Sequence, residues 1–198
     1  ITGGGAMFLN DAVAAHPSMT PVCNHHEQAS AMAAVAYSKY TGKPSLVSPT
    51  TGCGGTNTIT GVTSSWIDSV PVIFISGQVY LNQTIGKSKI RQRGVQETNI
   101  IDLIKPITKY SVMVKNKNDI KYHLDKAYYE TSKDRPGPVW IDVPANIQNS
   151  WIDINELNNF SPKKSNTKNR SRKKEEIIIN NISKKLLNSK KPILFIGR

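Results

Sequence analysis

The feature that most constrains the fold is an apolar run, Val-Pro-Val-Ile-Phe-Ile-Ser, at positions 70–76. Its β-branched and aromatic residues do not alternate with polar ones, which is typical of a strand buried on both faces of a parallel sheet. A second such run, 139–143, lies between the turn Arg135-Pro136-Gly137-Pro138 and Pro144. Because parallel strands need crossover connections, the pattern predicts an α/β fold: an open, mostly parallel sheet with helices on both faces.

The periodicity of the remaining residues supplies the other elements. We expect further strands at 20–23, 45–49 and 108–114. We expect helices at 6–15, 28–40, 59–68 and 119–132, with a helical turn at 99–104. A Gly/Thr loop is expected at 50–57, and a polar loop with one short helix at 80–98. Strands and helices therefore alternate through the first 150 residues, as a parallel sheet requires.

The C-terminal part differs in composition. Residues 1–160 hold 14 Lys and Arg against 12 Asp and Glu, a net charge of +2, whereas residues 161–198 hold 12 against 2, a net charge of +10. We expect a domain at 1–150, a polar basic linker at 151–174, and at 175–198 an amphipathic helix and one strand that start a second domain. Because a lone strand cannot form a domain, the chain is expected to be part of a longer protein, and its first domain to lack its first helix.

Several classes of protein are disfavoured. Within the basic part, residues 163–174 are rich in Ser, Asn and Lys and carry no aromatic residue that could stack on bases, so we do not expect nucleic-acid binding. No apolar run is long enough to span a membrane, and no signal peptide is visible. Two cysteines, Cys23 and Cys53, are too few for a disulfide framework. We therefore expect a cytoplasmic protein without membrane association.

Three polar loops follow predicted strands: 25–28, 50–57 and 76–79. Loops after parallel strands emerge at the carboxyl edge of the sheet, where ligands bind, so Glu27, the glycine loop and Gln78 should share one rim. Taken alone, Glu27 is also what an ordinary helix N-terminus contains. The glycine loop lacks a phosphate-binding signature, and a tight turn explains it equally well.

The chain also contains a series of short motifs in a characteristic order: Gly3-Gly4-Gly5-Ala6, His26-Glu27-Gln28, Ala36-Tyr37, Thr41-Gly42, Thr51-Gly52-Cys53-Gly54-Gly55-Thr56-Asn57, Gly61-Val62, Asp68-Ser69-Val70-Pro71, Ser76-Gly77-Gln78-Val79, Gln96-Glu97, Lys105-Pro106-Ile107-Thr108-Lys109 and Arg135-Pro136-Gly137-Pro138-Val139. This series resembles the amino-terminal pyrimidine-binding domain of thiamine-diphosphate enzymes. Acetolactate synthase large subunits and their relatives are the most similar group. The resemblance covers about residues 1–150, and the stretch from Lys191 resembles the first strand of that family's central domain.

The resemblance implies roles for individual residues. Glu27 would hydrogen-bond a ring nitrogen of the cofactor's aminopyrimidine and take part in the proton relay that activates the cofactor, and Gln78 would lie near the reacting carbon. Both are candidate catalytic residues. No metal ligand is expected in this chain. The candidate cofactor-binding residues are Gly3, Gly4, Glu27, Thr50, Cys53, Gly54 and Asn57.

The resemblance also implies an activity for the whole protein: decarboxylation of a 2-oxo acid and transfer of the two-carbon unit to an acceptor carbonyl. In the family, Mg²⁺ and the diphosphate are bound through a second domain that carries Gly-Asp-Gly, a motif that does not occur in this chain. That domain belongs to a second subunit, so a homodimer or homotetramer is expected and this chain alone would be inactive. Whether the central domain binds FAD is left open.

Two alternatives stay open at this point. One is a decarboxylase or lyase of the same superfamily, and the other is a non-catalytic domain for subunit association, with its basic tail bound to an anionic partner. The chain departs from the family pattern at Cys53 and Gly3, where proline is usual, and at Val95, where Phe is usual. The segment 87–93 is also longer than usual. Because this segment helps to shape the substrate pocket, the acceptor is not fixed by the resemblance.

Overall fold

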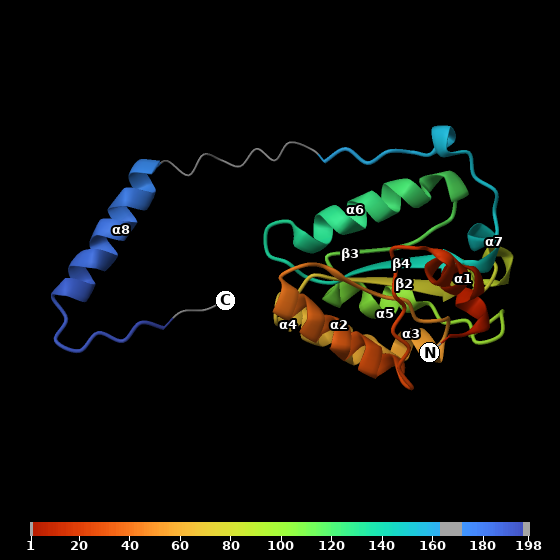
Figure 1. Ribbon diagram of the computed structural model, residues 1–198, viewed down its shortest axis with the longest axis horizontal. Helices are drawn as coiled ribbons and strands as arrows, with labels where there is room; N and C mark the ends of the chain where they lie inside the picture. The colour runs from red at the N-terminus through yellow and green to blue at the C-terminus, as the bar shows by residue number, and fades with distance from the viewer. Residues whose placement is uncertain (1, 163–171, 196–198) are drawn as a thin grey trace. The chain divides into compact units, whose positions relative to one another are not determined.

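The computed structural model describes residues 2–162 and 172–195. The chain divides into two compact units, Ile1–Ser161 and Pro162–Arg198 (Figure 1). The first unit contains the sheet and all of the candidate site residues. In the second unit the described helix is α8 (Arg172–Leu187). Of the predicted linker at 151–174, residues 163–171 lie outside the described residues.

The sheet of the first unit has four parallel strands in the order β1-β2-β4-β3. Their bounds are β1 (Ser45–Val47), β2 (Val72–Gln78), β3 (Tyr110–Met113) and β4 (Val139–Pro144). The two largely apolar runs form the central strands β2 and β4, whose register pairs Ile73 with Val139 and Gln78 with Pro144. The predicted parallel α/β sheet is confirmed.

Helices cover both faces of this sheet (Figure 1). On one face, Phe74 and Trp140 pack against a group of helices that includes α2 and α4. On the other face, Val139 and Ile141 pack against residues of α1, α6 and α7. The helices are α1 (Met7–Ala15), α2 (Glu27–Thr41), α3 (Cys53–Asn57), α4 (Ile59–Ile67), α5 (Ile100–Ile104), α6 (Ile120–Ser132) and α7 (Ala145–Gln148). Short 3₁₀ turns are η1 (Gly4–Ala6), η2 (Leu81–Gln83), η3 (Lys105–Ile107), η4 (Lys117–Asp119) and η5 (Ile154–Glu156).

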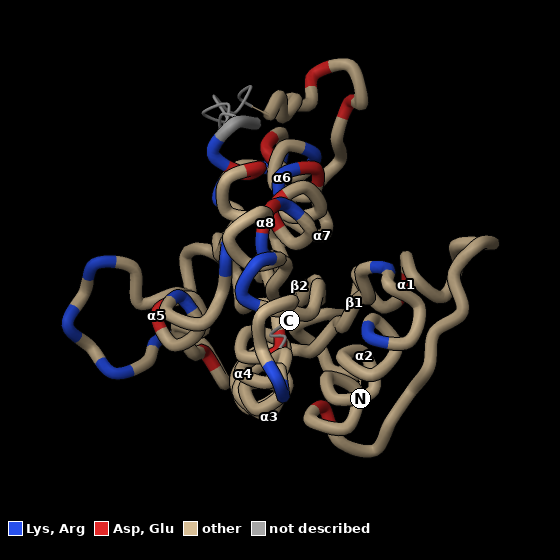
Figure 2. Tube along the Cα trace, turned by 90° about the vertical axis from the view of Figure 1, so that its left-hand side faces the viewer, with Lys and Arg blue, Asp and Glu red and all other residues tan. Residues whose placement is uncertain are grey.

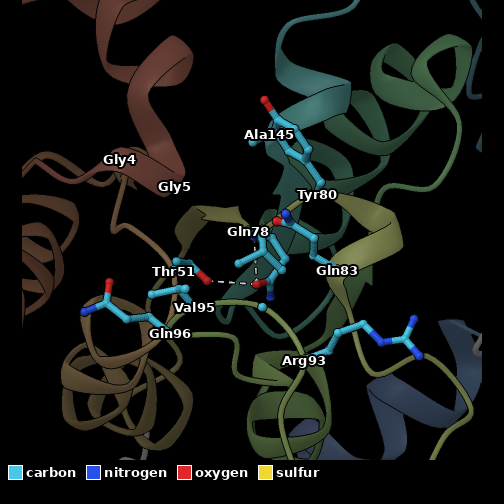
Figure 3. Close-up of a pocket in the computed structure, with 12 residues that line it drawn as sticks. Gly4, Gly5, Thr51, Gln78, Tyr80, Gln83, Arg93, Val95, Gln96 and Ala145 are labelled. Atoms are coloured by element: carbon cyan, nitrogen blue, oxygen red, sulfur yellow. Dashed lines mark hydrogen bonds between the residues drawn. The ribbon is translucent and has the colours of Figure 1, made fainter.

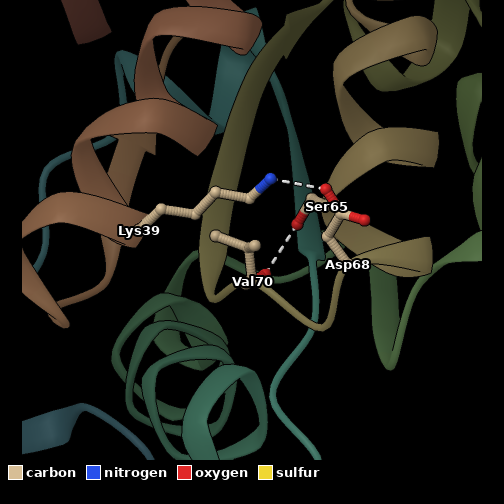
Figure 4. Close-up of polar contacts among 4 residues, drawn as sticks. All are labelled: Lys39, Ser65, Asp68 and Val70. Atoms are coloured by element: carbon tan, nitrogen blue, oxygen red, sulfur yellow. Dashed lines mark hydrogen bonds and ion pairs between the residues drawn. The ribbon is translucent and has the colours of Figure 1, made fainter. Parts of the chain in front are cut away.

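Close packing of α2 on α4 fixes the helix that carries Glu27. A Cβ atom at Gly61 would lie 2.3 Å from Cβ of Ala31, so the two helices approach at their small residues. Beyond this contact, Lys39 Nζ lies 2.5 Å from Asp68 Oδ2, and the Ser65 hydroxyl donates to the Val70 carbonyl (Figure 4). Because the ion pair is about 40% exposed, it contributes little, and the packing carries most of the stabilisation.

Two expectations about local structure are wrong, and a third can be tested only in part. Residues 20–23 form no strand, since Pro21 lacks an N–H donor and the segment is exposed rather than paired. The expected loop 50–57 contains α3, which begins at Cys53 and whose N-cap, Gly52, adopts a positive φ of 65°. Residues 191–195 are not in a strand, and the rest of that predicted strand lies outside the described residues.

The described residues contain no helix with the length and apolar character that crossing a membrane requires.

Candidate functional site

Glu27 is the first residue of α2, and its side chain is buried, with 6% exposure. The N-cap is His26, whose Nδ1 accepts a hydrogen bond from the Gln28 N–H. A first-turn acid that serves only to offset the helix dipole normally reaches solvent, whereas Glu27 faces inward. Its Oε2 accepts a 3.0 Å hydrogen bond from Nδ2 of Asn57, at the end of α3. The tertiary fold therefore brings two of the predicted cofactor-binding residues into contact.

The glycine loop lies against the same carboxylate. A Cβ atom at Gly54 would lie 3.5 Å from Glu27 Oε1 and 2.6 Å from Thr50 Cγ2. A Cβ atom at Gly3 would also lie 2.7 Å from Thr50 Cγ2. Thr50 is thus packed closely against Gly3 and Gly54, and its hydroxyl is buried without a hydrogen-bond partner in the described part of the chain. Cys53, one residue before Gly54, is exposed.

Gln78 ends β2 and is almost completely buried, with 2% exposure. Its Oε1 accepts from the Thr51 hydroxyl at 2.8 Å and from the Val79 N–H at 3.0 Å. Its Nε2 donates to Asp142 Oδ2 and to the Thr98 carbonyl, both at 3.0 Å. Every hydrogen-bonding position of the amide is therefore used within the protein, which fixes its orientation. To contact a substrate directly, Gln78 would have to exchange one of these bonds.

Asp142 contacts the candidate site residue Gln78 but was not predicted from the sequence. It lies on β4 opposite Ser76 of β2, with 1% exposure, and accepts a 2.6 Å hydrogen bond from the Ser76 hydroxyl as well as the bond from Gln78. The indole N–H of Trp140 donates to the same Ser76 oxygen. Burial raises the pKa of Asp142 from 3.8 to about 7, although both hydrogen bonds act in the opposite direction. One feature of the sequence could have pointed to Asp142, because it is the single acid in the otherwise apolar run 139–143.

A cavity of about 370 Å³ opens next to Gln78 (Figure 3). Its walls come from the N-terminal turn (Gly4 and Gly5), from the loops that follow β1 and β2, and from the segment before α5. Of the predicted site residues, Gly4 and Gln78 line it, whereas Glu27 and Asn57 do not. The full lining is Gly4, Gly5, Thr51, Gln78, Val79, Tyr80, Gln83, Arg93, Gly94, Val95, Gln96 and Ala145.

The predicted rim therefore has two adjoining parts. One part is the cluster of Glu27, Thr50 and Asn57, and the other is the open cavity at Gln78. Thr50 and Thr51 are consecutive residues and connect the two parts. No group of three or more His, Cys, Asp or Glu side chains that could hold a metal ion occurs within the described ranges.

Comparison with known proteins identifies the family of the chain. Residues 1–103, more than half of the chain, match the family model described as "Thiamine pyrophosphate enzyme, N-terminal TPP binding domain". The acetolactate synthase large subunit of Haemophilus influenzae is 35% identical over 202 residues, which cover 98% of this chain and 33% of that protein.

Two further relatives are also named acetolactate synthase. The acetolactate synthase large subunit of Lactococcus lactis is 33% identical over 98% of this chain and 32% of its own length. The chloroplastic acetolactate synthase of Arabidopsis thaliana is 30% identical over 98% of this chain and 28% of its own length. The chain thus spans about a third of the length of these relatives. It belongs to the thiamine pyrophosphate enzyme family, whose N-terminal TPP-binding domain it contains.

Proposed function

We propose that this chain is the pyrimidine-binding part of an acetolactate-synthase-like enzyme that decarboxylates a 2-oxo acid and transfers the two-carbon unit to an acceptor carbonyl. The relatives named acetolactate synthase support this reaction, and the resemblance of the motifs supports the same assignment.

The observation that carries the proposal is the buried carboxylate of Glu27. One of its oxygens, Oε2, accepts from Asn57. Among the described residues no donor is bonded to Oε1, beside Gly54. An acid held in this way can accept a hydrogen bond from a protonated ring nitrogen and exchange a proton with it. When bound, thiamine diphosphate would supply the acidic thiazolium carbon and the capacity to stabilise a carbanion.

The neighbouring residues fit an aminopyrimidine ring. Gly54 leaves the space beside Oε1 free of a side chain, so that a flat ring can approach the backbone closely. The Thr50 hydroxyl is buried without a hydrogen-bond partner in the described part of the chain, and a polar atom of a bound ring that reached it would satisfy it. In this proposal Gly3, Gly4, Thr50, Cys53, Gly54 and Asn57 surround the pyrimidine, while Glu27 holds its proton and Gln78 fixes the wall of the adjoining cavity.

The rest of the active site would come from outside these 198 residues. We propose that the diphosphate and Mg²⁺ are bound by another domain of a second subunit, so that the complete enzyme is a homodimer or homotetramer and this segment alone is half a site. The resemblance to acetolactate synthases supports this arrangement. A cytoplasmic location stays a prediction from the sequence, and the resemblance leaves open whether the complete protein binds FAD.

A product assay on the complete protein tests the proposed reaction. The protein is incubated with thiamine diphosphate, Mg²⁺ and pyruvate, and both CO₂ and the 2-hydroxy-2-acyl product are measured, with a cofactor-free sample as the control. We expect CO₂ and condensation product in equal amounts. CO₂ without condensation would instead identify a decarboxylase, and no consumption of any 2-oxo acid tried would support a non-catalytic domain.

A further inference from the structure

The loop between β2 and α5 is built around one acid, Glu97. Its carboxylate accepts backbone N–H bonds from Ile85, from Arg93 at 2.8 Å and from Gly94 at 3.3 Å. These bonds join the outgoing and returning arms of the loop. The backbone at Arg93 is therefore held in place even though its side chain is exposed.

Packing of Gly94 fixes the same point against the cavity. Gly94 is buried, and a Cβ atom there would lie 3.0 Å from the Gln83 carbonyl oxygen and 3.0 Å from Val79 Cγ1. Since both neighbours line the cavity, the returning arm forms part of its wall. The side chain of Arg93 consequently starts at the mouth of the cavity.

The side chains that line the cavity carry positive charge and no negative charge. Arg93 is the one charged side chain among its twelve lining residues, and none of them is an acid. The guanidinium points away from Gln78 and donates a long, 3.4 Å bond to the Asn82 carbonyl (Figure 3). Within the described part of the chain Arg93 makes no ion pair, and most of its five N–H donors have no partner. Rotation of this side chain into the cavity breaks no strong interaction.

We propose that Arg93 binds the carboxylate of the 2-oxo acid substrate in this cavity and thereby favours substrates that carry a carboxylate. This inference rests on the proposed function. Arginine matches a carboxylate with two parallel hydrogen bonds, and such charge-assisted bonds are stronger than neutral ones. The cavity is large enough for a small acid, and the fixed amide of Gln78 on its inner wall would leave Arg93 as the mobile binding group.

The same loop offers matched controls. Lys87, Lys89 and Arg91 are exposed cations on the loop, which lies beside α5 in Figure 2, but none of them lines the cavity. Loss of Arg91 removes the same charge two residues away. If substrate binding depended only on the general positive potential of the loop, Arg91→Ala and Arg93→Ala would therefore weaken it equally.

The experiment compares Arg93→Ala, Arg93→Lys and Arg91→Ala in the complete enzyme. We expect Arg93→Ala to raise KM for the 2-oxo acid at least about tenfold with kcat changed less than about threefold, as for loss of a charged hydrogen bond. Arg93→Lys should recover part of the loss, and Arg91→Ala should stay within about twofold of wild type. Equal KM values for Arg93→Ala and Arg91→Ala would overturn the proposal.

Calorimetric binding of oxamate, a non-reacting carboxylate analogue, gives a readout that does not depend on turnover. Arg93→Ala should weaken oxamate binding by the same factor as KM, while the affinity for thiamine diphosphate stays unchanged. If wild type turns over no 2-oxo acid, the proposed function fails, yet the oxamate comparison still tests Arg93. If wild type is active and both arginine variants bind oxamate equally, the inference about Arg93 alone fails.

Discussion

Asn57 Nδ2 donates a 3.0 Å hydrogen bond to Glu27 Oε2, which connects the end of α3 to the first residue of α2. The two residues are 30 positions apart in the sequence. The bond supplies a donor to a carboxylate that is largely withdrawn from water. Because Oε2 faces Asn57, Oε1 is the oxygen that lies beside Gly54.

Removal of this donor should affect both stability and cofactor binding. We expect Asn57→Ala to lower the free energy of unfolding by about 1–3 kcal/mol, because one oxygen of a buried acid loses its partner. Asn57→Asp should cost more, since it places a second carboxylate against Glu27. Urea unfolding measures the change in the free energy of unfolding, and titration with thiamine diphosphate measures the change in cofactor affinity. If both variants were as stable as wild type, the bond would have no structural importance.

Asp142 should make stability depend on pH. Its pKa is raised from 3.8 to about 7, so the folded protein keeps a proton that the unfolded chain releases at lower pH. The free energy of unfolding should therefore fall as the pH rises from about 4 to about 7, by roughly 4 kcal/mol. Asp142→Asn keeps an oxygen that can accept from Gln78 and should remove this slope. Urea unfolding of wild type and variant across that pH range tests it, and parallel curves would contradict the prediction.

Gly77 should not tolerate a side chain. A Cβ atom there would lie 1.9 Å from the Gly5 carbonyl oxygen, in the turn that forms one wall of the cavity. We expect Gly77→Ala to cost about 3 kcal/mol, because backbone atoms would have to move apart. Gly4→Ala is the matched control, since nothing lies within 4 Å of its Cβ position. Thermal unfolding compares the two, and an equal effect would show that the contact at Gly77 is not tight.

The strands could be predicted from sequence where burial leaves a strong pattern. The apolar runs at β2 and β4 are buried on both faces, so their composition alone reveals them. The prediction for residues 20–23 was wrong because an apolar tetrapeptide does not reveal whether a partner strand exists. The short helix α3 was not predicted because glycine is a poor helix former, and the turn depends on Gly52 and its neighbours.

The polar network beneath the cavity could not be predicted from local sequence. Ser76 and Asp142 are 66 residues apart, and only the parallel register of β2 and β4 places them opposite each other. The full set of bonds to the Gln78 amide likewise depends on four separate segments. Glu27 was a candidate because of its motif, but its burial and its contact with Asn57 are tertiary properties.

In the proposed mechanism, the buried carboxylate of Glu27 takes part in proton transfer to and from the cofactor. Turnover of the complete enzyme with Glu27→Gln, relative to wild type, measures this most directly, with the exposed Glu156→Gln as control. We predict a loss of about 10²- to 10⁴-fold for Glu27→Gln with the fold intact, and no loss for Glu156→Gln. Near-normal turnover by a correctly folded Glu27→Gln enzyme would show that Glu27 takes no part in this proton transfer.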